Sequence, residues 1–300
     1  MSAPAAATLD APDPPRTDPA APEPVLRDVP GPSALGGGAR RFWELLTVIA
    51  VTDFKKTYFG TALGYVWSLG RPLMLFGVLL AVFTQVFRLG SQVPHYPVLL
   101  LMNIVLFGFF QEATSVAVYS VVGQEAVVRK TQFPRLVIPL AVVLTSMFNL
   151  LLNLVVVAIF LFAFGVPISW TWLGVVPVLI LLTGITTAVS MIVASLYPRF
   201  RDIAILWTVA STALFYATPV LYPISSLSKH PTLHHIIELN PLAPILELAR
   251  KWIVQPSAPG PVAAAGGWPE LGAAAAIYVA ICVLAVWVFQ REAPRIAEQL

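Results

Sequence analysis

The residues whose types could do chemistry are few in this sequence, and they lie inside long apolar stretches. Glu112 stands near the middle of stretch 97–122, while Asn149 and Asn153 are four residues apart in a second stretch. On a helix, that spacing puts both asparagines on one face. A charge exposed to lipid costs about 3 kcal/mol, so Glu112 must face helices or water. It either lines a solute path or is protonated and hydrogen-bonded within a bundle. For the asparagines, bonds between helices are favoured over solute contact.

Common motifs of catalysis and nucleotide binding do not occur in this sequence. It has no G-x-x-x-x-G-K-S/T loop, no H-E-x-x-H and no G-x-S-x-G. His230, His234 and His235 have a spacing that could hold a metal, but an ordinary polar loop is favoured. A single cysteine, Cys282, excludes a multi-thiolate site. One glutamate is also a poor proton relay, which argues against a secondary transporter. We therefore expect no catalytic residue, metal or cofactor on this chain.

The elements that must position these residues are membrane helices. Hydrophobic residues make up 58% of the chain and charged residues 11%, less than half the charged share of a soluble protein. A membrane-crossing helix needs about 20 mostly apolar residues. Six stretches qualify, and they predict an all-α integral membrane protein with six transmembrane helices at about 64–87, 97–122, 136–164, 173–196, 203–221 and 271–289.

The ends of the chain have a different character. Residues 1–38 are rich in proline and alanine and are expected to be a disordered tail. Residues 39–60 predict an amphipathic helix, either lying in the membrane interface with Trp43 at headgroup depth or packed on a partner protein. The six spans then occupy 61–290, and residues 291–300 form a cytoplasmic tail.

Basic residues set the expected orientation. With both termini in the cytoplasm, twelve of the sixteen lysines and arginines that flank the spans lie on the cytoplasmic side. An odd number of spans would weaken this bias, which favours a multi-pass protein with six crossings. On the outer side, 231–239 and 242–254 predict short helices, broken by Asn240-Pro241. Each is too short to cross, so we expect them to re-enter the outer leaflet or cap a pathway.

The connection between the second and third spans is polar and ends in basic residues. It reads Gly-Gln-Glu-Ala-Val-Val-Arg-Lys-Thr-Gln-Phe-Pro-Arg over 123–135. Pro134 suits the first turn of the next helix. The segment is either a charged loop obeying the positive-inside rule or a helix that docks into a cytoplasmic partner.

Three motifs in this order resemble a known family. They are Asp53-Phe-Lys-Lys-Thr-Tyr58 with Leu63-Gly-Tyr-Val-Trp67, then Arg129-Lys-Thr-Gln-Phe-Pro-Arg135, and finally Thr218-Pro-Val-Leu-Tyr-Pro223 with Leu239-Asn-Pro-Leu-Ala-Pro244 and Glu247-x-x-Arg250. Over about residues 40–290 the chain resembles the membrane permease of type-2 ATP-binding cassette exporters, in the polysaccharide, O-antigen and teichoic-acid export branch. One departure is Arg71, where members of that family often have an uncharged polar residue.

The resemblance implies partners for this chain. They are a second copy of the chain, two copies of a separate ATPase that carries the ATP and magnesium, membrane lipid and a lipid-linked glycan, with no nucleic acid. It implies a bacterial plasma (inner) membrane location. The N-terminal helix and the 124–132 segment would contact the ATPase, with candidate coupling residues Glu44, Asp53, Lys55, Lys56, Glu125, Arg129, Lys130, Phe133, Pro134 and Arg135.

A glycan path should offer aromatic faces and hydroxyls rather than ions. The candidate pathway residues are Phe83, Phe87, Tyr96, Phe107, Phe110, Glu112, Asn149, Asn153, Trp207, Tyr216 and Tyr222. Two other functions stay open on the sequence. One is an exporter of the same family that handles a drug or a small lipid, and the other is a membrane-embedded glycan-modifying transferase.

Overall fold

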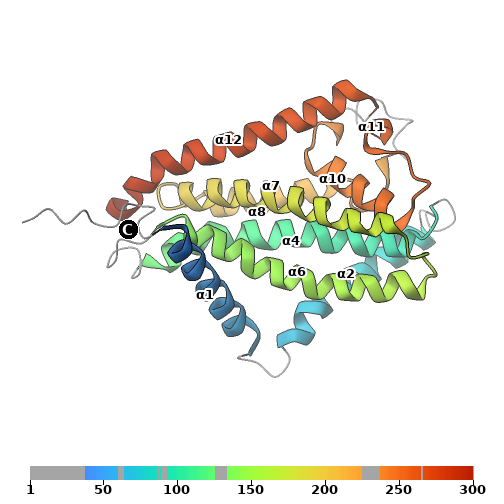
Figure 1. Cartoon of the computed structure of the whole chain (residues 1–300), viewed down its shortest axis with the longest axis horizontal. Coiled ribbons are helices and arrows are strands. Elements are labelled where there is room, and N and C mark those ends of the chain that lie inside the picture. Colours follow the sequence, from blue (N-terminus) through green and yellow to red (C-terminus); the bar gives the residue numbers. More distant parts are fainter. Residues whose placement is uncertain are drawn as a thin grey trace, which may run out of the picture. The chain divides into compact units, whose positions relative to one another are not determined.

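A computed structural model of the chain describes residues 38–59, 64–86, 88, 93–125, 134–224, 237–264 and 266–299 (Figure 1). The chain divides into two units, Met1–Gly31 and Pro32–Leu300, and all described residues belong to the second. The Pro/Ala-rich tail expected at 1–38 therefore lies outside the described residues except for Gly38.

Every regular element within the described ranges is helical. The elements are α1 (Gly38–Phe59), α2 (Gly64–Gln85), α4 (Tyr96–Gly123), α6 (Val137–Ala163), the 3-10 helix η1 (Trp170–Gly174), α7 (Val175–Leu196), α8 (Ile203–Ala217), α10 (Leu242–Ala249), the π-helix η3 (Arg250–Val254), α11 (Pro261–Ala264) and α12 (Trp268–Gln299).

Five helical stretches in this part of the chain are long and apolar enough to cross a membrane: Val66–Gln85, Tyr96–Gly123, Val137–Ala163, Trp170–Leu196 and Trp268–Glu292. They match five of the six predicted spans. The remaining span, expected at 203–221, is shorter than predicted because α8 has 15 residues and ends at Ala217. Thr218 precedes Pro219 and is extended, with ψ 147°. A residue before proline disfavours the helical conformation, which accounts for the early end.

α4 lies at the centre of the bundle. It packs along α6 on one side and α7 on another, and α12 packs on the far side of α7 (Figure 1). Most of α4 is buried, whereas α2 and α12 are largely exposed. A helix that is apolar on all sides is typical of the interior of a bundle. The exposed apolar faces of α2 and α12 are those expected of lipid-facing helices.

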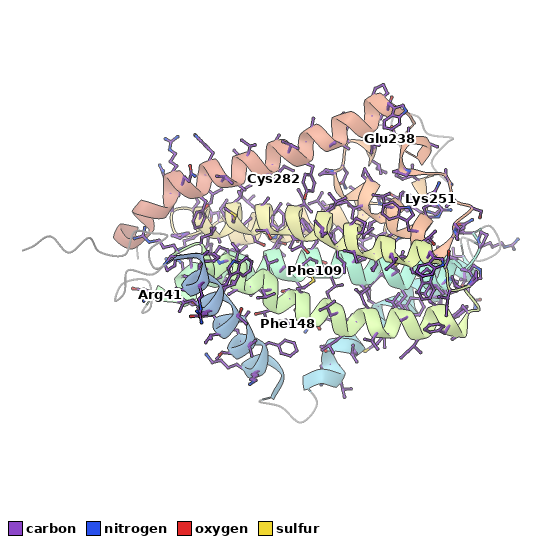
Figure 2. All side chains as sticks on the ribbon, in the orientation of Figure 1. Arg41, Phe109, Phe148, Glu238, Lys251 and Cys282 are labelled. Carbon is purple, nitrogen blue, oxygen red and sulfur yellow. The ribbon has the colours of Figure 1, made fainter. Side chains whose placement is uncertain are left out.

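α1 packs across the first half of α6. Leu46 and Ala50 are buried against Val137 and Ala141. Phe54 meets Phe148, which is labelled in Figure 2, edge to face with ring centroids 5.6 Å apart. The apolar face of the predicted amphipathic helix is thus covered largely by the same chain. Trp43 remains 61% exposed beside this contact.

Arginines gather at one end of the bundle. This end carries the end of α4, the start of α6, the turn between α7 and α8 and the last turns of α12. Arg135, Arg199, Arg201 and Arg291 lie there, and we call it the basic end. α10 and η3 lie at the opposite end, over α7, η1 and α4 (Figure 1). Together they confirm the helix predicted over 242–254, whereas most of the one predicted over 231–239 lies outside the described residues.

Candidate functional site

A cleft opens on one side of α4, between α2 and α6. Its volume is about 670 Å³. Amide, carboxylate, guanidinium and hydroxyl groups line it beside aromatic rings. The lining includes Trp67, Ser68, Arg71, Phe107, Phe109, Gln111, Glu112, Ser115, Asn149, Asn153 and Phe215; Phe109 is labelled in Figure 2. A cavity of this size with a few polar groups is typical of a ligand site.

α4 supplies the floor of the cleft through one stripe of residues. The stripe runs through Gly108, Gln111, Glu112, Ser115 and Val116, which are not buried although most of the helix is. Steps of three and four residues keep these positions on one face. Gln111, Glu112 and Ser115 therefore face the cleft and not the apolar interior.

Glu112, Asn149 and Asn153 form a hydrogen-bonded chain across this cleft. The side-chain amide of Asn149 donates to the Glu112 carboxylate at 2.8 Å. Asn153 donates to the backbone oxygen of Asn149 at 2.9 Å and to its side-chain oxygen at 3.2 Å. The expected bond between helices is thus present, and the same three residues also line the cleft. The sequence left open whether these residues line a solute path or bond helices together, and the two roles are compatible here.

The aromatic candidates occupy three kinds of position. Phe107, Phe110 and Tyr96 are buried in the core, and Phe107 also forms part of the wall of the cleft. Phe83 and Trp207 are half-buried, and the Trp207 indole donates to the Thr114 hydroxyl at 3.1 Å. Tyr216 is exposed, and the Tyr222 hydroxyl donates to its backbone oxygen at 3.0 Å. Phe87 lies outside the described residues. Of these eight aromatics, Phe107 is the one that the structure brings into the cleft with Glu112.

A second polar site lies where the chain leaves α8, in the 218–224 segment. The amide of Asn103 on α4 donates to the carbonyl oxygens of Pro219 and Val220, at 3.2 Å each. The Tyr96 hydroxyl donates to the carbonyl oxygen of Leu221 at 2.8 Å. Side chains of α4 therefore replace the helical partners that these buried carbonyl groups lack.

The residues around α10 hold the same segment from the other side. Asn240 donates to the Thr218 hydroxyl at 2.8 Å, and the Ile224 amide donates to Glu247 at 3.1 Å. Arg250 approaches the second oxygen of Glu247 at 3.4 Å. Thr218, Asn240, Glu247 and Arg250 all belong to the third motif of the sequence, so the spacing of that motif reflects one connected network.

The candidate coupling residues that the structure describes lie on α1 and at the basic end. Glu44 pairs with Arg40 at 2.9 Å, and Asp53 lies 3.9 Å from Lys56. Lys55 is also on α1, Glu125 follows α4, and Pro134 and Arg135 precede α6. Arg129, Lys130 and Phe133 lie outside the described residues.

A family model described as ABC-2 type transporter matches residues 44–254. This match spans more than half of the chain. The chain belongs to the ABC-2 type transporter family.

Two relatives are both named O-antigen export system permease protein RfbA. The chain is 31% identical to the one from Klebsiella pneumoniae over 205 residues, which are 68% of this chain and 78% of the relative. It is 29% identical to the one from Myxococcus xanthus over 206 residues, which are 67% of this chain and 77% of the relative.

The family determines which subunit spans the membrane and which hydrolyses ATP. The chain is the membrane permease of an ABC-2 transporter, and in this family the ATPase activity resides in a partner subunit. The matched region begins within α1 and ends with η3, so it contains both the cleft and the network around the 218–224 segment. No group of three metal-ligating side chains occurs within the described ranges of the permease.

Sequence reasoning missed Asn103 and did not assign Arg71 to a site. The signal for Asn103 was a lone amide within the run Leu-Leu-Leu-Met-Asn-Ile-Val-Leu. Polar residues in membrane spans usually face partners inside the bundle, so the residue type was informative. Its partners are backbone carbonyl groups more than a hundred residues away, and these could not be identified from the sequence.

Proposed function

We propose that the permease exports a lipid-linked polysaccharide across the bacterial plasma membrane, as a pair of identical chains with two copies of a separate ATPase. The names of its relatives support the substrate class. The observation that carries the proposal is the composition of the cleft. Amides, hydroxyls and aromatic rings outnumber charged groups among its lining residues.

This composition suits a glycan because sugar rings present hydroxyls at their edges and C–H groups on their faces. Asparagine and glutamine amides both donate and accept hydrogen bonds, so they match sugar hydroxyls. Trp67 supplies exposed aromatic surface in the same cleft, and the buried rings of Phe107 and Phe109 form part of its wall. A simple ion or a very apolar drug would not use both kinds of group.

In this proposal the permease crosses the membrane six times, with both termini in the cytoplasm. α8 has 15 residues, about 22 Å of helix, against a hydrocarbon core about 30 Å thick. The four residues from Thr218 to Leu221 add at most about 13 Å. Irregular backbone is tolerated at membrane depth where protein buries it, and the contacts from Tyr96 and Asn103 meet that condition.

The proposed mechanism couples the basic end to the cleft. ATP binding closes the partner subunits, and the connection between α4 and α6 transmits the movement. Glu125 follows α4 and Glu112 lies 13 residues earlier, about 20 Å along the helix. One rigid element thus joins the proposed ATPase contact to the polar stripe, and the two nucleotide states favour two arrangements of the cleft. α10 and η3 would close the exit.

Deletion of the gene with complementation tests the function. Cells without the permease are expected to lose surface polysaccharide and to accumulate lipid-linked glycan on the cytoplasmic side. The wild-type permease should restore export and should co-purify with an ATP-binding cassette ATPase. Normal surface polysaccharide in the deletion strain would overturn the substrate class. Purification without an ATPase that remains intact in the same membranes would overturn the proposed assembly.

A further inference from the structure

Arg71 is an arginine in an unusual position. It lies on α2, five residues inside the candidate span Val66–Gln85, and its side chain is exposed and lines the cleft. In the part of the chain that the structure describes, no hydrogen bond or ion pair reaches its guanidinium group. Arginine in an apolar span is costly, so it is expected to meet a counter-charge.

Glu112 does not supply that counter-charge by direct contact. Its carboxylate accepts the hydrogen bond from Asn149, and no ion pair joins it to Arg71 among the described residues. The two opposite charges therefore line one cleft and attract each other without a direct contact. Five N–H donors of Arg71 remain available to an anion, and a guanidinium matches the oxygens of a phosphate group in pairs.

Trp67 stands one helical turn before Arg71 and lines the same cleft. Residues four apart on a helix are neighbours on its surface. The Trp67 side chain is 60% exposed, so its ring is open to a ligand beside Arg71. A cation and a flat aromatic face next to each other match a phosphate group attached to a sugar ring.

We propose that Arg71 and Trp67 form a subsite for the phosphorylated sugar at the lipid-linked end of the substrate. Arg71 binds the phosphate, and Trp67 packs on the sugar. The inference rests on the proposed function. It adds that the permease recognises the junction between glycan and carrier lipid, which is the same whatever the length of the polymer.

The shared chemistry here is a phosphate group on a lipid, and an ordinary phospholipid headgroup is the other source of it. The position of Arg71 in a cleft walled by α4 and α6, with Trp67 beside it, favours the glycolipid. A phospholipid would occupy Arg71 from the lipid side and would not depend on Trp67.

The test measures lipid binding by full-length permease in phosphatidylcholine nanodiscs. Four probes are used: a polyprenyl phosphate sugar, the polyprenyl phosphate alone, a polyprenyl glycoside without phosphate, and phosphatidylglycerol. Arg71→Gln should weaken binding of both polyprenyl phosphates about tenfold, because a hydrogen-bonded charge contact is lost. Trp67→Leu should weaken binding of the two probes that carry a sugar, the polyprenyl phosphate sugar and the polyprenyl glycoside without phosphate. Arg201→Gln, at the basic end and outside the cleft, is the matched control and should bind all probes as wild type does.

Arg71→Lys keeps the charge but loses the paired donors, so its affinity should fall between those of wild type and Arg71→Gln. If Arg71→Gln does not fold, Arg71→Lys and Trp67→Leu carry the test. Wild-type affinity of the variants for the polyprenyl phosphate sugar would overturn the inference but not the proposed function. Equal binding of phosphatidylglycerol with the same dependence on Arg71 would assign the site to ordinary phospholipid. Failure of the proposed function is separate, because the deletion strain would then keep its surface polysaccharide.

Discussion

Asn149 on α6 donates its side-chain amide to the carboxylate of Glu112 on α4, across 2.8 Å. This bond joins two neighbouring helices of the bundle at the wall of the cleft. Asn153 fixes the orientation of the Asn149 amide by donating to its side-chain oxygen at 3.2 Å. One polar contact therefore both ties the helices together and presents acceptors to whatever enters the cleft.

Replacing Asn149 with leucine should lower stability and export together. The Glu112 carboxylate would lose its donor, and hydrogen bonds between membrane helices contribute about 0.6–2 kcal/mol. Glu112→Gln keeps an acceptor for Asn149 and should stay within about 0.5 kcal/mol of wild type, the usual range of a substitution that breaks no such contact. Thermal unfolding in nanodiscs measures the first effect, and surface polysaccharide in complemented cells measures the second. Equal stability of Asn149→Leu and wild type would show that the bond does not hold the helices.

Substitution of two tyrosines tests whether the hydrogen bond from Tyr96 stabilises the 218–224 segment. The buried Tyr96 donates its hydroxyl to the Leu221 carbonyl oxygen at 2.8 Å, whereas Tyr216 is 61% exposed. Tyr96→Phe leaves that carbonyl without its donor and should cost about 1–2 kcal/mol of unfolding free energy. Tyr216→Phe makes the same chemical change at an exposed position and should be neutral. Thermal unfolding of the two variants side by side gives the comparison. Equal loss in both would remove the assigned role of Tyr96.

Charge reversal of the basic residues between the second and third spans tests how the ATPase is coupled to export. Arg129 and Lys130 lie outside the described residues, so this prediction rests on the sequence. The double variant Arg129→Glu with Lys130→Glu should insert normally but reduce export at least about tenfold, the effect of losing about 1.4 kcal/mol of contact with the ATPase. Membrane content by immunoblot and surface polysaccharide are measured together. Unchanged export in the double variant would remove the coupling role.

Much of the fold could be predicted because membrane helices are specified locally. A run of about 20 apolar residues is sufficient evidence for a span, and the helix over 242–254 was readable from its length and its proline boundary. The end of α8 at Ala217 was missed although Pro219 signalled it. The apolar residues of 218–221 belong to a buried irregular segment, and hydrophobicity alone cannot distinguish such a segment from helix.

The candidate site was predictable in its residue types and less so in its contacts. Glu112, Asn149 and Asn153 were selected because polar groups in spans need partners, and the structure brings all three together. Asn103 was missed because its partners are carbonyl oxygens of the backbone, which no residue type marks. Arg71 was noticed only as a departure from a pattern. Its proximity to Glu112 in one cleft depends on how α2 packs on α4, a tertiary fact.

Glu247 and Arg250 form a buried ion pair in the network around the 218–224 segment. Their side chains lie 3.4 Å apart and are 4% and 7% exposed. Glu247 also accepts from the Ile224 amide at 3.1 Å, and Arg250 donates to Gln255 at 3.1 Å. Removing one partner from such a pair leaves a buried charge without compensation, which typically costs about 3–5 kcal/mol.

Glu247→Leu and Arg250→Met should therefore each be strongly destabilising, whereas the double variant should be less destabilised than the sum of the two. In the double variant no unpaired charge remains, and the residual loss comes from the Ile224 amide and the Gln255 side chain. A double-mutant cycle on the unfolding free energy measures the coupling, which should be at least about 1 kcal/mol for residues in direct contact. The exposed pair Arg40 and Glu44, 2.9 Å apart on α1, is the control cycle and should couple by less than about 0.5 kcal/mol. Additive losses at Glu247 and Arg250 would show that the two residues act separately on the 218–224 segment.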